Sequence, residues 1–184
     1  MPGSASDAVE IVLSEEIEAL VDFYDRTEAY LDDRPASDLF EPKPSVSDWS
    51  PAQHLYHIWR ANASRREAAR VAAGGGVDAE APRLTDAGRR VLQNGHLPRG
   101  TAEAPDAVRA PASLDREALR EAVHRSRKKL DDVAAEAEAV RAAPGGLERP
   151  AWGRLTARQW LRAARIHSEH HEAIVRDILD AASG

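Results

Sequence analysis

The sequence predicts an all-α protein built as a four-helix bundle, and three observations lead to this prediction. Apolar residues recur at spacings of three and four along four long segments, as helices that face a core require. Proline and glycine clusters separate these segments. No segment shows the alternation of apolar and polar residues that is typical of a strand.

The first two helices are bounded by clear stop and start signals. The first predicted helix covers residues 7–33 and ends before Pro35, and prolines interrupt the linker over residues 41–48. The second helix begins at the sequence SPAQ of residues 50–53, a capping box with proline at the first helical position. We expect it to end at the three glycines of residues 74–76, which remove any helical preference.

A long connection precedes the last two helices. Residues 74–112 are rich in glycine and proline, with one short helix expected at about 84–92. A connection of this length lets helices two and three run parallel, whereas a short loop would force them antiparallel. The third helix is predicted from residue 113 or 115 to 143, and the fourth from a second capping box at 156–159 to residue 179. The predicted topology is therefore up-down-down-up, in a single domain over residues 1–184.

Composition limits the chemistry that the chain can carry. Its 184 residues include 25 basic and 31 acidic side chains, for a net charge of −6, with seven histidines and no cysteine. The lack of cysteine excludes disulfides, a cysteine nucleophile, thiolate zinc sites and iron–sulfur clusters, so any metal must be held by histidine or carboxylate. The acidic balance argues against nucleic-acid binding, which needs a basic surface. The basic cluster Arg65–Arg66 is interpreted as helix surface offset by Glu67.

The sequence also indicates where the protein resides. No apolar run approaches the ~20 residues that a membrane-spanning helix needs. The first residues lack a basic region followed by an apolar one, so we expect no signal peptide. We therefore expect a cytoplasmic protein with neither a membrane nor a nucleic-acid partner.

The last predicted helix places two histidines on its apolar face. His167 and His171 lie one turn apart on a stripe from Ala157 to Ile178, with their side chains pointing the same way. This is the spacing of two metal-ligating histidines on one helix, although the absence of a His-Glu-x-x-His motif excludes the zinc-protease interpretation. The alternatives are a hydrogen-bonded pair of core histidines, or a helix rotated so that both are solvated.

A third histidine ligand would have to come from the second helix. His54 and His57 are the candidates, and periodicity does not choose between them because that helix is apolar nearly all round. His170 is expected at a boundary between core and solvent, and His96 and His124 are expected on the surface.

Two segments carry a recognisable pattern: WSPAQHLYH at residues 49–57, and PAWGRLTARQWL at residues 150–161 followed by HSEHH at residues 167–171. In this order and spacing they resemble the DinB/YfiT-like family of four-helix-bundle proteins. The resemblance implies a three-histidine site for a divalent metal ion at His57, His167 and His171.

The chain departs from the family pattern at two positions. His54 stands where relatives usually carry an apolar residue, and Arg149 stands where many have histidine. Neither departure touches the inferred triad, but either could alter what enters the site. Glu169 and Glu172 lie off the stripe and are expected on a solvated face. The four tryptophans are expected in the core, with dimer contacts as the alternative; they are Trp49, Trp59, Trp152 and Trp160.

Three neutral imidazoles would leave a divalent ion with its full charge and an open coordination position, as in a catalytic zinc site. Such an ion lowers the pKa of bound water, or binds a substrate thiolate or oxygen. Nickel, zinc, iron and manganese all remain candidates.

The resemblance implies a metal-dependent enzyme acting on a small molecule. Characterised relatives include S-transferases and isomerases that use a low-molecular-weight thiol such as bacillithiol, mycothiol or glutathione. The alternatives are a metal-dependent hydrolase and a non-catalytic dimeric bundle that binds metal. The sequence assigns no catalytic residue beyond the metal ligands.

Overall fold

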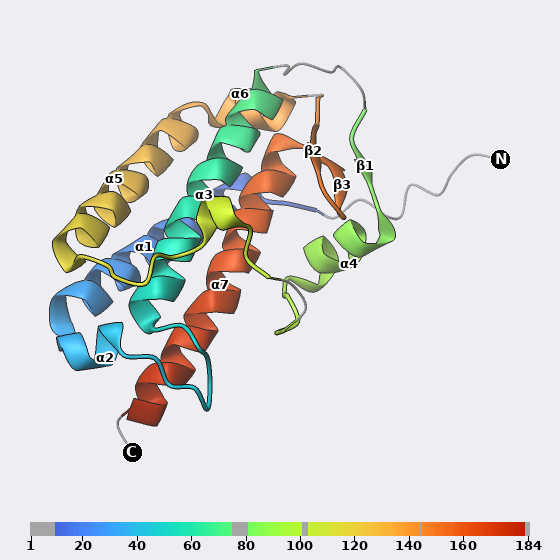
Figure 1. Cartoon of the computed structure of the whole chain (residues 1–184). Coiled ribbons are helices and arrows are strands. Elements are labelled where there is room, and N and C mark those ends of the chain that lie inside the picture. The colour runs from blue at the N-terminus through green and yellow to red at the C-terminus, as the bar shows by residue number, and fades with distance from the viewer. Residues whose placement is uncertain (1–9, 75–80, 101–102, 144, 183–184) are drawn as a thin grey trace.

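Helices account for most of the chain in the computed structural model, which describes residues 10–74, 81–100, 103–143 and 145–182 (Figure 1). The four longest helices are α1 (Leu13–Asp33), α3 (Pro51–Ala73), α5 (Arg116–Ala135) and α7 (Ala157–Ala182). Shorter elements are α2 (Ala36–Phe40), α4 (Asp86–Asn94), the 3₁₀ turn η1 (Asp106–Val108) and α6 (Ala137–Ala142). The prediction of a mostly helical protein is confirmed.

Three short strands form a small antiparallel sheet, which the sequence did not predict. They are β1 (Arg83–Leu84), β2 (Leu147–Arg149) and β3 (Gly153–Leu155), in the order β1-β3-β2. Strands of two or three residues are too short to show an alternating pattern, so the sequence carries no signal for them.

The observed elements differ from the predicted ones at several places; α7, for example, continues to Ala182, past the predicted end at residue 179. The first helix begins at Leu13, since residues 10–12 are not helical; residues 7–9 lie outside the described part of the chain. The predicted third helix is divided into α5 and α6 at Glu136, whose ψ of 11° leaves the helical region. The described part of the long connection contains β1, α4 and η1, where one short helix was expected.

Both predicted capping boxes are present. The Ser50 hydroxyl accepts the Gln53 N–H, and the Gln53 side-chain oxygen accepts the Ser50 N–H. Thr156 and Gln159 make the same reciprocal pair of hydrogen bonds. Because such a box fixes the first turn of a helix, the starts of α3 and α7 are defined by local sequence.

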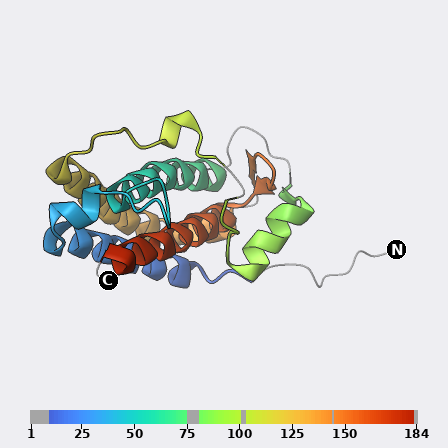
Figure 2. The ribbon, with the colours of Figure 1, turned by 60° about the horizontal axis from the view of Figure 1, so that its bottom comes forward.

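The helices pack so that α7 contacts both α1 and α3, while α5 packs mainly against α1 (Figures 1 and 2). Apolar side chains fill the space between them, and the largest fully buried ones come from α1, α3, α5, α7 and the segments beside them. No helix among the described residues is both long and apolar enough to cross a lipid bilayer.

Two buried glutamates join α1 to α7. Glu16 of α1 accepts a hydrogen bond from Arg162 at 2.7 Å, and Glu172 of α7 accepts two from Arg26 at 2.6 and 2.9 Å. Burial by itself raises the pKa of Glu172, but the hydrogen bond and charge of Arg26 lower it below its usual value overall. The expectation of a solvated face is therefore wrong for Glu172, whereas Glu169 is exposed.

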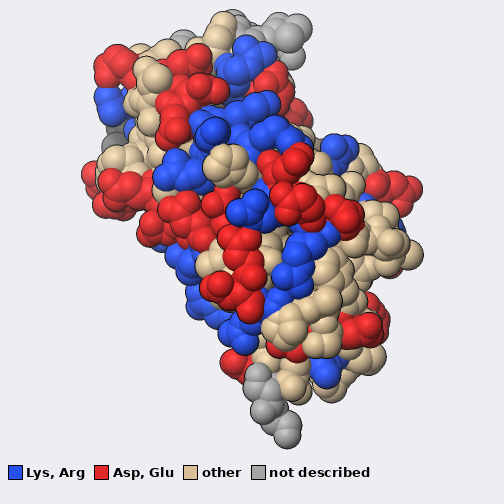
Figure 3. Space-filling view, turned by 90° about the vertical axis from the view of Figure 1, so that its left-hand side faces the viewer, with Lys and Arg blue, Asp and Glu red and all other residues tan. Residues whose placement is uncertain are grey.

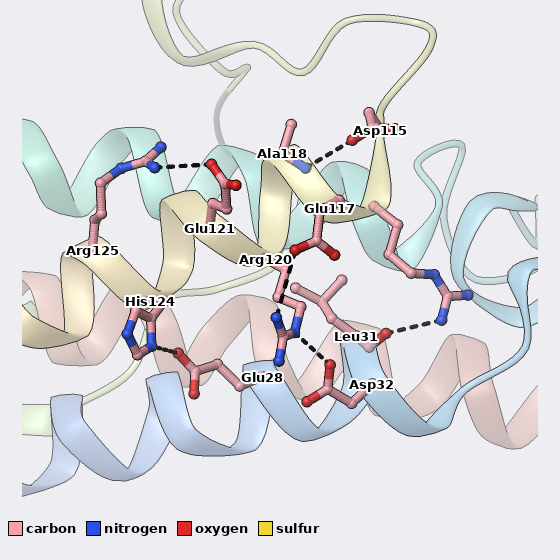
Figure 4. Close-up of polar contacts among 11 residues, drawn as sticks. Glu28, Leu31, Asp32, Asp115, Glu117, Ala118, Arg120, Glu121, His124 and Arg125 are labelled. Atoms are coloured by element: carbon pink, nitrogen blue, oxygen red, sulfur yellow. Dashed lines mark hydrogen bonds and ion pairs between the residues drawn. The ribbon is translucent and has the colours of Figure 1, made fainter.

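Charged side chains also connect α5 to α1 at the surface (Figure 4). Arg120 pairs with Asp32 at 2.6 Å, and His124 lies 3.0 Å from Glu28. Exposed pairs of this kind contribute about 0–1 kcal/mol each, so the apolar contacts carry most of the packing energy. On the face seen in Figure 3, basic and acidic side chains are interspersed, and neither sign forms a large separate patch.

Close backbone approaches define the end of the molecule where the sheet meets α4. Gly153 has a φ of +88°, and a Cβ there would lie 2.3 Å from the carbonyl oxygen of Arg83. A Cβ on Gly88, in the first turn of α4, would lie 2.3 Å from the carbonyl oxygen of Trp152. Both positions therefore require glycine.

We predict that Gly88→Ala destabilises the protein by on the order of 1–3 kcal/mol, because the added methyl group overlaps the Trp152 backbone. Alanine is ordinarily the better helix residue by about 0.5–1 kcal/mol, so the sign of the change is diagnostic. Urea unfolding monitored by circular dichroism measures the effect. Gln93→Ala, at an exposed position of the same helix, is the control. An unchanged or higher stability of Gly88→Ala would show that the approach is relieved without cost.

Candidate metal centre

Three histidines from two helices meet between α3 and α7. The structure brings together His57 of α3 with His167 and His171 of α7, and one ring nitrogen of each lies within 4.8 Å of those of the other two. His57 and His167 are 5% and 8% exposed, and His171 is partly buried. The three residues named from the sequence are therefore neighbours in space.

The packing of α3 on α7 explains this meeting. Asn62 of α3 donates to the Ser168 hydroxyl at 2.8 Å, and Arg65, one turn further on, donates to His167 at 3.2 Å. His57, at the earlier end of α3, instead faces His171, with ring centroids 4.8 Å apart. Residues further along α3 contact residues earlier in α7, so the two helices run antiparallel. The four-residue spacing on α7 then presents two imidazoles to one turn of α3.

Hydrogen-bond partners define the tautomer of His57. Its Nδ1 lies 2.9 Å from the carbonyl oxygen of Val108, which can only accept, so the imidazole proton is on Nδ1. The Nε2 atom of His57 therefore carries a lone pair, and it lies 3.2 Å from Nε2 of His167. A ligand imidazole held by a backbone carbonyl in this way is typical of metal sites.

His167 is held by the opposite kind of partner. Its Nδ1 accepts from the Arg65 guanidinium, which can only donate, so the proton of the neutral ring is on Nε2. That proton points toward the lone pair of His57. A single chain of hydrogen bonds therefore runs from Arg65 through His167 and His57 to the carbonyl of Val108.

His171, the third histidine of the triad, contacts His54. The Nδ1 atoms of His171 and His54 are 2.9 Å apart, and Nε2 of His54 lies 2.9 Å from the Ser47 hydroxyl. When the Nδ1–H of His171 donates to His54, Nε2 of His171 carries the lone pair that a metal ligand needs. His54 is thus placed as the partner of a candidate ligand, while the triad itself uses His57.

The long connection and Trp49 contact histidines of this region. The carbonyl of Val108 accepts from His57, and that of Leu97 lies 3.1 Å from the Nδ1 atom of His170. The Trp49 ring lies 5.3 Å from the rings of both His54 and His57.

Two surface hollows lie elsewhere. One of about 830 Å³ is next to β1 and β3, and one of about 230 Å³ is beside Phe40 and Gln53. No triad histidine lines either of them; the candidate centre lies among buried polar groups between α3 and α7.

Burial keeps the histidines neutral. It lowers the pKa of His171 to about 2 and that of His54 to about 4, and neighbouring histidines add to both shifts. Burial also lowers the pKa values of His57 and His167, and the charge of Arg65 acts in the same direction. Neutral imidazoles are the form that binds metal.

The predicted burial is correct for three other histidines and wrong for Arg65. His96 and His124 are exposed and His170 is partly buried, as predicted. The interpretation of Arg65 as surface is wrong: its Nε is buried, and burial together with the charge of Arg149 lowers its pKa to about 9. Arg65 lies eight residues after His57, about two turns further along the same side of α3, and this spacing could have identified it as a residue of the site.

The tryptophans divide into two pairs. Trp152 and Trp160 are buried in the core, whereas Trp49 and Trp59 are partly buried. The core expectation is confirmed for the first pair only.

Comparison with known proteins gives one result. A family profile described as the DinB superfamily matches residues 19–175, a span that includes all three histidines. No curated protein and no solved structure gives a significant match.

We predict that the metal-free protein loses stability as the pH falls below about 6.5, where histidines of the unfolded chain bind protons. The folded protein resists protonation of His54 and His171 down to pH values of about 4 and 2. Between pH 6.5 and 4 the unfolded state therefore binds more protons, and each such histidine costs about 1.4 kcal/mol per pH unit.

Urea unfolding at a series of pH values from 7 to 5 measures this slope. His171→Gln should reduce this slope by about 1.4 kcal/mol per pH unit, which corresponds to one bound proton. Equal slopes for wild type and His171→Gln would contradict the prediction.

Proposed function

Because the chain belongs to the DinB superfamily and brings three neutral histidines together, we propose that it is a metal-dependent enzyme whose divalent ion is held by His57, His167 and His171. The observation that carries the proposal is the 3.2 Å between the Nε2 atoms of His57 and His167. Two nitrogen ligands at tetrahedral angles, each bound at 2.0–2.1 Å, lie about 3.3 Å apart. The two atoms therefore stand at a ligating separation, which an ion could use once the proton on Nε2 of His167 is displaced.

A bound ion would supply Lewis-acid chemistry. Three neutral imidazoles leave it dipositive and short of a fourth ligand, so it can lower the pKa of a water or thiol bound there. Nickel, zinc, iron and manganese remain the candidate metals. The chain would position the ligands: Val108 orients His57, and His54 with Ser47 orients His171.

For the reaction, we favour transfer of a low-molecular-weight thiol to an electrophilic small molecule. Family resemblance implies this chemistry, and the cysteine-free chain is consistent with a thiol that arrives as cosubstrate. Metal-dependent hydrolysis and metal binding without turnover are the alternatives that the experiments below distinguish.

We also propose the up-down-down-up bundle topology for α1, α3, the α5–α6 pair and α7. Contacts of α7 with α1 and α3, and the length of the connection between α3 and α5, support it. A homodimer, a cytoplasmic location and a single domain over the whole chain stay predictions from the sequence.

We predict that the wild-type protein binds about one divalent ion per chain and that His57→Ala and His171→Ala each lose it. Removing one of three ligands leaves too few donors to hold the ion. Elemental analysis after equilibration with zinc or nickel measures the metal content. His124→Ala, which removes an exposed histidine on α5, is the matched control.

The partner of His171 should show an intermediate effect. His54→Ala is expected to keep the ion with an affinity about 10- to 100-fold lower, because the orienting contact is lost but no ligand is. Equal metal contents in the wild type and both ligand variants would exclude the triad.

A second prediction concerns turnover. The metal-loaded protein should consume a thiol in the presence of an electrophilic acceptor such as a chlorobimane, and the metal-free protein should not. Loss of free thiol, measured colorimetrically over a panel of glutathione, mycothiol and bacillithiol, reports the reaction. Ester or amide hydrolysis without thiol consumption would favour the hydrolase, and neither activity would favour the binding protein.

A further inference from the structure

The hydrogen-bond chain through the candidate centre is incompatible with a metal ligated by Nε2 of His167. Arg65 donates to Nδ1 of His167, so the ring proton is on Nε2, the atom that faces His57. To offer a lone pair at Nε2, the neutral ring must carry its proton on Nδ1. That Nδ1–H would then face another N–H of Arg65. The Arg65–His167 hydrogen bond therefore has to break when a metal binds through this atom.

Among the described residues only the Tyr24 phenol acts favourably on the charge of Arg65, and burial raises the pKa of that phenol, so it stays protonated. The Nε of Arg65 is buried without a hydrogen bond, and no carboxylate among the described residues forms an ion pair with this arginine. The two glutamates near the histidines on α7 are already paired, Glu169 with Arg165 and Glu172 with Arg26. A buried guanidinium left without an acceptor is costly, because its solvation is lost and nothing replaces it.

A second arginine increases this excess of positive charge. Arg149 of β2 is half-buried, stacks on the Trp152 ring at 3.6 Å, and is close enough for its charge to act on Arg65. No described carboxylate pairs with Arg149 either. A dipositive ion at the triad would add its charge to that of two guanidinium groups that no described carboxylate neutralises. The metal-loaded site would therefore favour the binding of an anion.

We propose that Arg65, assisted by Arg149, binds the oxyanion group of a small-molecule ligand, a carboxylate or a phosphate, when metal loading releases Arg65 from His167. Guanidinium groups bind carboxylates and phosphates alike through paired N–H donors, so either oxyanion would bind at the same arginine side chains. The inference rests on the proposed metal site and extends it to the substrate class: an anionic compound whose charged group binds beside the ion. Metal and anion then bind cooperatively.

This coupling is measurable without turnover. If the metal raises the affinity for the anion, the anion must raise the affinity for the metal by the same factor. Zinc affinity is measured by competition with a colorimetric chelator at constant ionic strength, in chloride alone and with added succinate or phosphate. We expect each effective oxyanion to tighten zinc binding to the wild type by about 5- to 150-fold. The larger of the two responses identifies the preferred oxyanion.

The variants separate this role from a structural one. Arg65→Gln should bind zinc in chloride at least as tightly as the wild type, because a competing donor and a positive charge are gone, and its affinity should not respond to anions. Arg149→Gln should show a reduced response. Arg66→Gln removes the neighbouring charge, which has no contact with His167 in the described structure, and should behave as wild type. Complexation of zinc by the anion in solution is common to all variants and weakens apparent binding in each.

The following results would overturn the inference. A wild-type zinc affinity that does not change with either oxyanion overturns the inference and leaves the metal site standing. A retained anion response in Arg65→Gln, or weaker zinc binding by its folded form in chloride, also overturns it, since Arg65 would then support the site rather than compete for it. Absence of zinc binding in the wild type overturns the proposed function and this inference together.

Discussion

The antiparallel contact between α3 and α7 is the constraint on which the rest of the structure depends. It buries a row of polar groups where a helix bundle would ordinarily place apolar ones, including His57 against His167 and Asn62 against Ser168. A buried polar group left unpaired costs about 1–3 kcal/mol. Sliding one helix past the other by a turn would break several pairs at once, so the polar row specifies the register that brings the three histidines together.

The long connection between α3 and α5 completes this row. His57 and His170 each have a ring nitrogen next to a carbonyl of the connection, at Val108 and Leu97. Further bonds from Gln53 and Arg60 to carbonyls of the same stretch hold it against α3. A short loop could not reach both helices, so the length of the connection allows it to contact the candidate site.

Features encoded by local sequence could be predicted, and features that depend on another helix could not. Periodicity placed His167 and His171 on one stripe, and the capping boxes at Ser50 and Thr156 are seen as predicted. The selection of His57 needed the family resemblance, because α3 turns both His54 and His57 inward. Arg65 and Glu172 were assigned to the surface because their partners lie on α7 and α1, which no spacing within one segment reveals.

His54 would affect the reactivity of an ion bound at the proposed site. A carboxylate next to a ligand imidazole raises its basicity and thereby lowers the net charge felt at the metal. His171 has a neutral histidine in that place, followed by the Ser47 hydroxyl, and His57 has a neutral carbonyl. With no carboxylate described in contact with any of the three rings, the ion would keep most of its charge. Such a centre would favour binding and activation of anionic ligands over the tight, closed coordination of a structural metal.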